Sequence, residues 1–207
     1  MIDKKVLICG IGGQDGSYLA KFLLEKGYEV WGTSRDAEGR KFGNLISLGV
    51  FEKVHILSVS LEDYHSVYSV VSNIKPDEIY NLAAQSSVGL SFDQPAESEC
   101  FGDSVELCSD ENTCFKPRSP YGIAKLASHL LVKNYSESYS IFACTGVLFN
   151  HESVFRPERY VTQKIIQSVK RIATGEQDQL ELGRLDISRD WGWAPEYIEA
   201  MWLMLQQ

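Results

Sequence analysis

The apolar residues of the chain follow two alternating patterns, short runs typical of strands and longer stretches with helical spacing. The short runs lie at residues 6–9, 29–34, 54–57, 78–83 and 142–148. The first is apolar and β-branched, as a strand buried in a parallel sheet requires, and we interpret the others as strands too. Between the runs, apolar side chains recur every three or four residues, which predicts amphipathic helices. We expect these helices at residues 15–26, 64–74, 120–132, 161–173 and 194–207, and a further short strand at residues 180–182. The alternation predicts a doubly wound, Rossmann-type α/β fold around a parallel sheet.

A glycine-rich turn, Gly10-Ile-Gly-Gly-Gln-Asp-Gly16, joins the first strand to the first helix. Strand, glycine turn and helix in this order place a helix N-terminus where it can bind a phosphate group. The glycines fit the register GxxGxxG, formed by Gly10, Gly13 and Gly16, because Asp15 interrupts the alternative register GxGxxG. A tight strand-to-helix turn is the other explanation of the glycines, and the flanking strand and helix favour dinucleotide binding.

Arg35 follows the second predicted strand, where a dinucleotide-binding fold contacts the adenosine ribose. An acidic residue at this place favours NAD, and an arginine favours the 2′-phosphate of NADP. Ser34 and Arg35 therefore favour NADP, whereas Asp36 leaves NAD open. A solvated turn is the alternative for these residues.

Tyr121 and Lys125 lie four residues apart on one predicted helix, so they share a face. A phenol with a pKa near 10 is a poor base at neutral pH. An ammonium group one turn away stabilises the phenolate and can hold a ribose hydroxyl of a nicotinamide cofactor. The spacing YxxxK is common by chance, but after a glycine loop and four alternating strands it indicates a catalytic pair.

Composition and charge exclude several classes of function. The net charge of −8 argues against a nucleic-acid surface. No apolar stretch is long enough to span a bilayer, and the first residues lack the apolar region of a signal peptide. The five cysteines are odd in number and include no CxxC pair, which favours reduced thiols and argues against a metal site. We therefore expect a cytoplasmic protein without nucleic-acid or membrane partners.

Six stretches of the chain resemble the GDP-mannose 4,6-dehydratases, a branch of the extended short-chain dehydrogenase/reductases. The matching stretches are Gly10-Ile-Gly-Gly-Gln-Asp-Gly16-Ser-Tyr-Leu, Tyr80-Asn-Leu-Ala-Ala-Gln-Ser86, Pro117-Arg-Ser-Pro-Tyr121-Gly-Ile-Ala-Lys125, Leu148-Phe-Asn-His-Glu-Ser153, Arg156-Pro-Glu-Arg-Tyr-Val-Thr-Gln-Lys164 and Arg189-Asp-Trp-Gly-Trp-Ala194. Together they are distributed over nearly the whole chain.

The resemblance implies that NADP⁺ takes a hydride from C4 of GDP-mannose, that water is lost across C5 and C6, and that the hydride returns to C6. Tyr121 would be the base at the C4 hydroxyl, Lys125 its partner, and Glu99 the acceptor of the C5 proton. The implied cofactor residues, besides the catalytic pair, are Gly10, Gly13, Gln14, Asp15, Gly16, Arg35, Leu82, Ala83, Ala84, Ser86, His151 and Arg156. The implied residues for the nucleotide sugar are Asn150, Lys164 and Arg189, and the implied assembly is a homo-oligomer.

The chain departs from the family pattern between the fourth strand and Glu99. About thirty residues, the size of a strand–helix crossover, are missing there, and Glu97 occupies a position that carries Ser or Thr in the family. Either the sequence joins pieces of a longer protein or the chain is truncated with a damaged site. We expect an interruption between residues 98 and 99, because a sheet that lacked this strand would leave buried strand edges unpaired.

We therefore predict a Rossmann domain for NADP over residues 1–150 and a partial substrate-binding region over residues 151–207. An active GDP-mannose 4,6-dehydratase is the first hypothesis for the function. A related nucleotide-sugar epimerase or reductase is the second. A truncated, catalytically silent protein that binds a cofactor or another subunit is the third.

Overall fold

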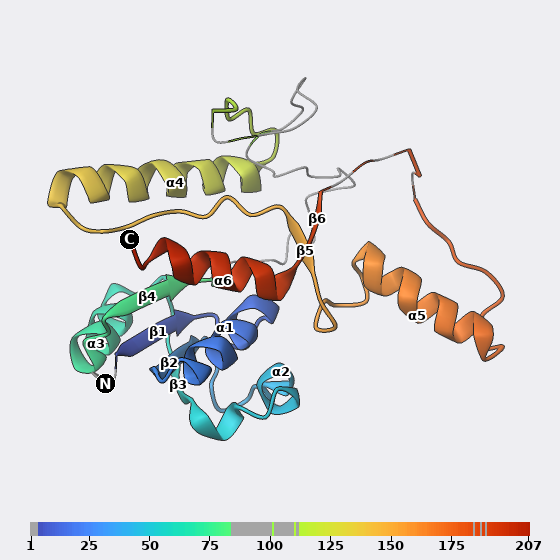
Figure 1. Ribbon diagram of the computed structural model, residues 1–207, viewed down its shortest axis with the longest axis horizontal. Helices are drawn as coiled ribbons and strands as arrows, with labels where there is room; N and C mark the ends of the chain where they lie inside the picture. Colours follow the sequence, from blue (N-terminus) through green and yellow to red (C-terminus); the bar gives the residue numbers. More distant parts are fainter. Residues whose placement is uncertain are drawn as a thin grey trace. The chain divides into compact units, whose positions relative to one another are not determined.

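The computed structural model describes residues 4–83, 101, 110, 112–183, 185–186, 188 and 190–207 (Figure 1). The chain forms two compact units, one of residues 1–85 and 194–207 and the other of residues 86–193. We call them unit 1 and unit 2. The functional division at residue 150 stays a prediction. The predicted junction at residues 98 and 99 lies outside the described residues.

Unit 1 contains the parallel sheet that the sequence predicts. Its strands are β1 (Lys5–Cys9), β2 (Glu29–Ser34), β3 (His55–Ser58) and β4 (Glu78–Asn81), in the order β3-β2-β1-β4. The helices of the unit are α1 (Gln14–Glu25), α2 (Gly43–Ser47), α3 (Tyr64–Ile74) and α6 (Ala194–Met204), with a 3₁₀ turn η1 at Phe51–Lys53. The predicted α/β Rossmann class is confirmed.

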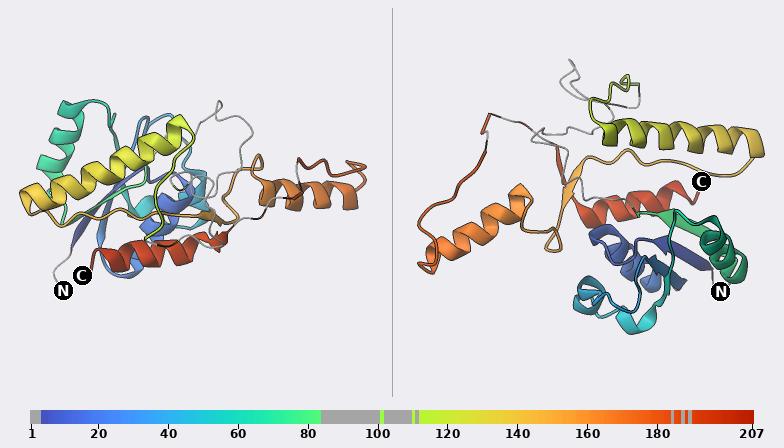
Figure 2. Two further views of the ribbon diagram at one scale, coloured as in Figure 1. Left: turned by 90° about the horizontal axis from the view of Figure 1, so that it is seen from above. Right: turned by 180° about the vertical axis from the view of Figure 1, so that it is seen from behind.

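Helices cover both faces of this sheet. Leu7 and Cys9 of β1 point to one face and pack against Ile74 near the end of α3. Val6 and Ile8 point to the opposite face because side chains alternate along a strand, and they are completely buried. The two views of Figure 2 place α1 and α6 on this second face and α3 on the first. The side chain of Asp63 caps α3, because its oxygens accept hydrogen bonds from two backbone N–H groups of the first turn.

Helix α6 belongs to unit 1 although more than a hundred residues separate it from β4. It packs on α1, where the Trp202 ring meets Phe22 edge-on with 5.8 Å between centroids. Lys26 Nζ lies 3.8 Å from the centroid of the Trp202 ring, and Trp202 Nε1 donates a hydrogen bond of 3.2 Å to the Tyr28 hydroxyl. Unit 2 is therefore an insertion between β4 and α6.

Unit 2 contains two long helices and a small parallel ladder. The helices are α4 (Pro120–Tyr139) and α5 (Val161–Ala173), and the strands are β5 (Asn150–Glu152) and β6 (Trp191–Trp193). Ring contacts connect the helix α4 to the residues around it. Phe115 stacks on Phe101 with 5.2 Å between ring centroids, and its ring lies 5.3 Å from that of His129 in a tilted arrangement. Among the described residues, no helix is long and apolar enough to cross a membrane.

Two predicted strands of unit 2 are wrong. Residues 142–148 are extended but form no strand, and Phe142 is 60% exposed instead of buried. A strand exists only beside a partner, and the described part of unit 2 offers none to this segment. Residues 180–182 form a loop. Side-chain amides make hydrogen bonds along this stretch, where a strand would have hydrogen bonds to a neighbouring strand. Gln177 Nε2 donates to the Gln179 carbonyl, and Gln179 Nε2 donates to Glu181.

Candidate functional site: the glycine loop and the tyrosine helix

The glycine loop lies in unit 1 between the carboxyl end of β1 and the N-terminus of α1. The backbone N–H groups of Gly10 and Ile11 both donate to the Thr33 carbonyl, at 3.1 and 3.3 Å, which ties the loop to β2. The Ser17 hydroxyl lies 2.9 Å from the Ile11 carbonyl and 2.7 Å from that of Gly13. The loop is therefore held from both of its ends.

Gly10 and Gly16 are required by the packing of the loop itself. Gly10 has a φ of +86°, a conformation that side chains rarely adopt. A Cβ at Gly10 would also lie 3.0 Å from the backbone of Ala83, after β4. A Cβ at Gly16 would lie 2.4 Å from the Gly10 carbonyl oxygen. These two glycines let the helix, the loop and the end of β4 come together.

Gly13 differs from its neighbours, because no contact among the described residues requires a glycine there. Its φ is −76°, which every residue can adopt, and a Cβ would meet only the Gly10 carbonyl oxygen at 3.4 Å, an ordinary contact. Gly13 is the N-cap of α1 and carries no capping side chain. The first N–H groups of α1 therefore face a space that a phosphate can approach closely.

Two charged side chains, Arg35 and Asp36, follow the end of β2. The exposed side chain of Arg35 makes no hydrogen bond or ion pair with the described residues. Asp36, in contrast, accepts a 2.7 Å hydrogen bond from the Gly39 backbone N–H and so shapes its own turn. The hydroxyl of Ser34 donates to the Asp36 carbonyl at 3.2 Å, and Ser58 accepts from the Ala37 N–H at 3.0 Å.

Arg40 contacts the glycine loop and was not among the predicted site residues. Its guanidinium donates a 2.9 Å hydrogen bond to the Gly12 carbonyl and lies 5.7 Å from the centroid of the Phe42 ring. No motif could have indicated this contact, because the two residues are far apart in the chain. Only the fold brings the loop after β2 back to the first turn.

The predicted cofactor residues of unit 1 gather at one edge of the sheet, since parallel strands end on the same side. Gln14 and Asp15 lie in the first turn of α1, where Gln14 Nε2 donates to Asp15 at 3.0 Å. Leu82 and Ala83 follow β4, and the N–H of Leu82 donates to the Cys9 carbonyl at 3.0 Å. Ala84 and Ser86 lie outside the described residues.

Tyr121 and Lys125 lie on one face of α4 in unit 2, as their spacing predicts. The helix begins with Ser119 as N-cap, whose hydroxyl accepts a 2.9 Å hydrogen bond from the Gly122 N–H, and Pro120 occupies the first turn. Lys125 Nζ lies 5.3 Å from the centroid of the Tyr121 ring. Both side chains are half-buried. Glu99, their predicted catalytic companion, lies outside the described residues.

A network of charges and rings surrounds β5 in the same unit. His151 Nδ1 lies 2.8 Å from the Phe149 carbonyl, which favours the tautomer that donates from this nitrogen. Arg156 Nε lies 3.1 Å from a Glu152 oxygen, and its guanidinium lies 3.7 Å from the centroid of the Tyr160 ring. Arg156 therefore lies between a carboxylate and an aromatic ring, close to the end of β5.

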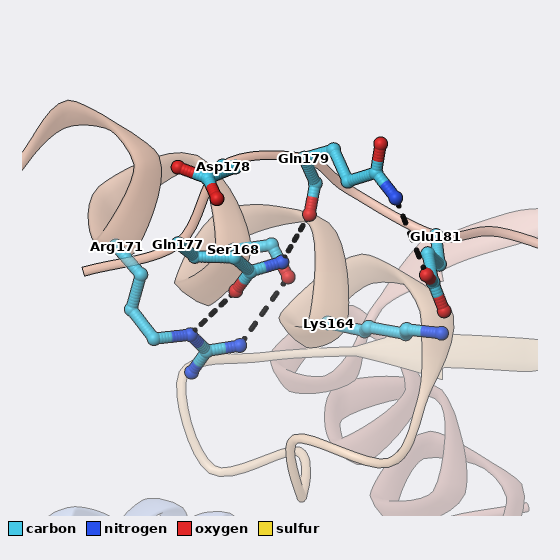
Figure 3. A pocket seen from close by; sticks show the side chains of 7 residues that line it. All are labelled: Lys164, Ser168, Arg171, Gln177, Asp178, Gln179 and Glu181. Atoms are coloured by element: carbon cyan, nitrogen blue, oxygen red, sulfur yellow. Dashed lines mark hydrogen bonds between the residues drawn. The ribbon is translucent and has the colours of Figure 1, made fainter. Parts of the chain in front are cut away.

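A polar pocket of about 580 Å³ lies between α5 and the residues that follow it (Figure 3). Arg171 is one of the residues that line it. Its Nε donates a hydrogen bond to Gln177 at 2.9 Å, and its Nη1 forms an ion pair with Glu158. Lys164 extends into the pocket toward Glu181 (Figure 3), and its side chain forms no ion pair with the described residues. Among the described residues, Lys164 is therefore the cation of this pocket without an ion-pair partner. Of the other predicted substrate residues, Asn150 is the first residue of β5, and Arg189 lies outside the described residues.

The sequence model of one protein family, GDP-mannose 4,6 dehydratase, matches residues 7–98 and residues 96–207. The chain belongs to this family. The two matched segments meet at residues 96–98, which is the place where the sequence departs from the family pattern.

Named relatives agree with this membership. The chain is 42% identical over 243 aligned positions to the GDP-mannose 4,6 dehydratase of Drosophila melanogaster, covering 99% of this chain and 62% of the fly protein. The human protein of that name is 42% identical, with 97% of this chain and 64% of the relative covered. The chain thus spans less than two thirds of the length of these curated relatives.

Two solved structures have the same fold. The dTDP-glucose 4,6-dehydratase of Bacillus anthracis, in complex with NAD, matches with a TM-score of 0.77 and 16% identity over 99% of this chain and 72% of that one. The UDP-glucose 4-epimerase of Thermus thermophilus, also with NAD, matches with a TM-score of 0.75 and 21% identity over 98% of this chain and 75% of that one. At these identities the likeness concerns the fold.

Proposed function

We propose that this protein is a nucleotide-sugar dehydratase that converts GDP-mannose to GDP-4-keto-6-deoxymannose with bound NADP. Membership of the family supports the reaction, and the glycine loop supports the cofactor. The observation that carries the proposal is Gly13, a glycine that no internal contact requires, placed as N-cap of α1 beside two glycines that the packing does require. A pyrophosphate on the first turn of α1 accounts for this missing side chain.

The residues at the end of β2 support NADP over NAD. Arg35 has no partner among the described residues, so its guanidinium can bind a 2′-phosphate. The carboxylate of Asp36 accepts the Gly39 N–H at 2.7 Å, so it is already engaged. Gln14, Asp15, Leu82 and Ala83 would line the same edge, and we assign Ala84, Ser86, His151 and Arg156 to the cofactor from the resemblance.

Arg35→Ala tests this preference. A hydrogen bond to a charged group contributes about 1.5–3 kcal/mol, so the substitution should weaken NADPH binding by at least about tenfold and leave NADH binding unchanged. Lys41→Ala is the matched control, because Lys41 is an exposed cation of the same loop without a partner among the described residues. Titration of cofactor fluorescence measures the affinity of each of the three proteins for NADPH and for NADH. Equal affinity of the unmodified protein for NADH and NADPH would refute the preference.

The proposed chemistry divides between a tyrosine–lysine pair and a carboxylate. When bound, NADP⁺ supplies the acceptor for the C4 hydride and later returns it to C6. Tyr121 takes the proton of the C4 hydroxyl, and the Lys125 ammonium, 5.3 Å from the centroid of the Tyr121 ring, favours the phenolate. Glu99 takes the C5 proton as water leaves across C5 and C6. Asn150, Lys164 and Arg189 hold the nucleotide sugar, with Lys164 directed at its diphosphate.

Two variants separate these roles. Tyr121→Phe should abolish hydride transfer, so no NADPH absorbance should form from NADP⁺ and GDP-mannose. Glu99→Gln should still allow C4 oxidation, seen as transient NADPH absorbance, and block the dehydrated product in mass spectrometry. Tyr135→Phe, on an exposed part of the same helix, is the control and should behave like the unmodified protein. Loss of both steps in both variants would refute the division of roles.

The meeting of the two family segments at residues 96–98 favours a second hypothesis, a catalytically silent protein that binds the cofactor. This hypothesis predicts NADPH binding that depends on Arg35, with no absorbance change and no product from GDP-mannose. Product formation from a UDP-sugar in place of GDP-mannose would indicate the related epimerases. We further propose that the protein works in the cytoplasm as a homo-oligomer, with residues 1–150 for the cofactor and 151–207 for the substrate.

A further inference from the structure

Gly12 has no room for a side chain, because two side chains from the loop after β2 lie against it. A Cβ at Gly12 would be 3.0 Å from the guanidinium carbon of Arg40 and 3.0 Å from a ring carbon of Phe42. The guanidinium also donates a hydrogen bond of 2.9 Å to the Gly12 carbonyl. A side chain at Gly12 would displace the guanidinium, so this glycine gives Arg40 its place on the glycine loop.

The hydrogen bond from Arg40 holds one end of a peptide unit whose other end is held within the loop. In the unit between Gly12 and Gly13 the carbonyl accepts from Arg40, and the Gly13 N–H donates to the Gly10 carbonyl at 3.0 Å. A peptide unit is planar, so the two hydrogen bonds together define its orientation. Glycine on both sides would otherwise let the unit rotate. Gly13 is the N-cap of α1, so this orientation determines where the first N–H groups of the helix point.

The backbone beside Arg40 adopts a conformation that is rare for a large side chain. Phe42 has a φ of +43°, in the left-handed region that favours glycine. It is 3% exposed, and its ring stacks on that of Phe51 with 6.0 Å between centroids. The Arg40 guanidinium lies 5.7 Å from the centroid of the Phe42 ring. Such strain persists only where the surroundings impose it, and it is concentrated at functional sites. The strain at Phe42 therefore indicates a role for this turn beyond stability.

The charge of Arg40 is in a place that folding alone does not favour. The N-terminus of a helix is the positive end of its dipole, where a cation is unfavourable and an anion is favourable. The Arg40 guanidinium donates to the residue just before the N-cap of α1. Among the described residues, no carboxylate forms an ion pair with it. An anion bound at the first turn of α1 would offset this unfavourable charge.

We propose that Arg40 is a positioning residue for the cofactor. Its hydrogen bond fixes the peptide between Gly12 and Gly13, and this keeps the first turn of α1 in the conformation that accepts a diphosphate. The inference rests on the proposed function, because it requires a dinucleotide on the glycine loop. The role differs from the one proposed for Arg35, which concerns the 2′-phosphate of NADP alone. Since NADPH and NADH share the diphosphate, Arg40 supports the binding of both.

Arg40→Ala tests this role through the two cofactors. The affinities for NADPH and for NADH should both fall about tenfold, with their ratio unchanged. Arg40→Lys keeps a charged donor for the Gly12 carbonyl, and should restore both affinities to within about threefold of the unmodified protein. Lys41→Ala is the control, because Lys41 is the exposed neighbouring cation without a partner among the described residues, and it should bind like the unmodified protein.

Hydrogen exchange measures the positioning without any cofactor. The amide of Gly13, followed by NMR, should exchange about fivefold faster in Arg40→Ala than in the unmodified protein, because its peptide unit is then held at one end only. The amides of β1 should exchange at unchanged rates. Equal acceleration at Gly13 and in β1 would mean that Arg40 only stabilises unit 1 as a whole, and would overturn the positioning role.

Gly12→Ala perturbs the same contact from the loop side, and it tests the inference even if Arg40→Ala does not fold. The new Cβ would displace the guanidinium, so both affinities should again fall about tenfold. The double variant Gly12→Ala/Arg40→Ala should be at most about threefold weaker than either single variant, because both remove one interaction. Independent effects would multiply to about a hundredfold loss, and would overturn the inference.

The cofactor titrations separate this inference from the proposed function. Unchanged affinities in Arg40→Ala, beside an unmodified protein that binds NADPH, would overturn the inference and leave the proposed function in place. A loss confined to NADPH would make Arg40 a ligand of the 2′-phosphate, and would also overturn the positioning role. Failure of the unmodified protein to bind either cofactor would refute the proposed function and this inference with it.

Discussion

Glu78→Gln should destabilise unit 1 because Glu78 joins four elements of the chain at the amino end of the sheet. Its side chain is 7% exposed. One carboxylate oxygen accepts from Lys4 Nζ at 3.0 Å, from the Tyr28 hydroxyl at 3.0 Å and from Gln206 Nε2 at 3.3 Å. The other accepts from the Tyr80 hydroxyl at 2.9 Å. The buried carboxylate of β4 thus connects the residue before β1, the residue before β2 and the segment that follows α6.

The size of the effect follows from the loss of the negative charge. A hydrogen bond to a charged group contributes about 1.5–3 kcal/mol, compared with about 0.5–1.5 kcal/mol for a neutral pair. Glutamine preserves the shape and one acceptor oxygen, so we expect the free energy of unfolding at pH 7 to fall by about 2 kcal/mol. Glu78→Ala would leave both tyrosine hydroxyls without their acceptor, and should cost about 3–5 kcal/mol.

The pH dependence identifies the charge as the cause. Burial by itself would raise the pKa of Glu78, but the hydrogen bonds from Lys4, Gln206, Tyr80 and Tyr28 together outweigh it, so the pKa lies below its ordinary value. A lowered pKa in the folded state means that the stabilisation is present above the unfolded pKa of about 4.3 and is lost as the pH falls through the folded pKa. The difference between Glu78→Gln and the unmodified protein should therefore shrink below about pH 4.

Urea unfolding at pH 7 and at lower pH measures this difference, and hydrogen exchange of the β1 amides reports on unit 1 separately from unit 2. Glu62→Gln is the control, because Glu62 is exposed and has no partner among the described residues, so its free energy of unfolding should change by less than about 0.5 kcal/mol. A difference for Glu78→Gln that stays the same at both pH values would refute the role of the charge.

Further predictions concern the glycine loop and the cysteines. Gly16→Ala should lower the free energy of unfolding by about 1–3 kcal/mol, because the new Cβ would lie 2.4 Å from a carbonyl oxygen; Gly13→Ala should leave it nearly unchanged in urea unfolding but weaken NADPH binding about tenfold. Loss of stability in Gly13→Ala would contradict this contrast. Burial raises the pKa of the Cys9 thiol, and Cys114 is exposed, so iodoacetamide should label Cys114 about tenfold faster in peptide mass spectra. Equal labelling rates would show that β1 opens readily.

The first and last residues of some elements could be predicted, because short sequence signals mark where these elements begin and end. The bounds of β2 (Glu29–Ser34), α3 (Tyr64–Ile74) and α5 (Val161–Ala173) are those that the sequence predicts. In α3 the cap of Asp63 defines the start, and Lys75 in the left-handed conformation ends the helix. The shared face of Tyr121 and Lys125 could likewise be predicted, because a spacing of four residues places side chains one turn apart in any α-helix.

Features that depend on distant partners could not be predicted. Residues 142–148 have the strand pattern but form no strand, because pairing is a property of two segments and a pattern describes only one. The contact of Arg40 with the Gly12 carbonyl and the return of α6 to α1 also depend on the tertiary fold. The hydrogen bond of Asp36 with the Gly39 N–H is local, but no motif indicated it, and the sequence alone left this carboxylate open as a determinant for NAD.

Two pairs of chemically similar residues differ in whether contacts with the described residues explain them. Gly16 is a glycine because the Gly10 carbonyl leaves no room for a side chain, whereas Gly13 has room and no internal reason to be glycine. Arg171 is paired with Glu158 and Gln177, whereas Lys164 on the same helix, in the same pocket, has no partner among the described residues. A glycine costs more conformational entropy on folding than other residues, and a bound phosphate would compensate this cost at Gly13. We propose that Gly13 marks the place of a phosphorylated cofactor and Lys164 that of the nucleotide sugar.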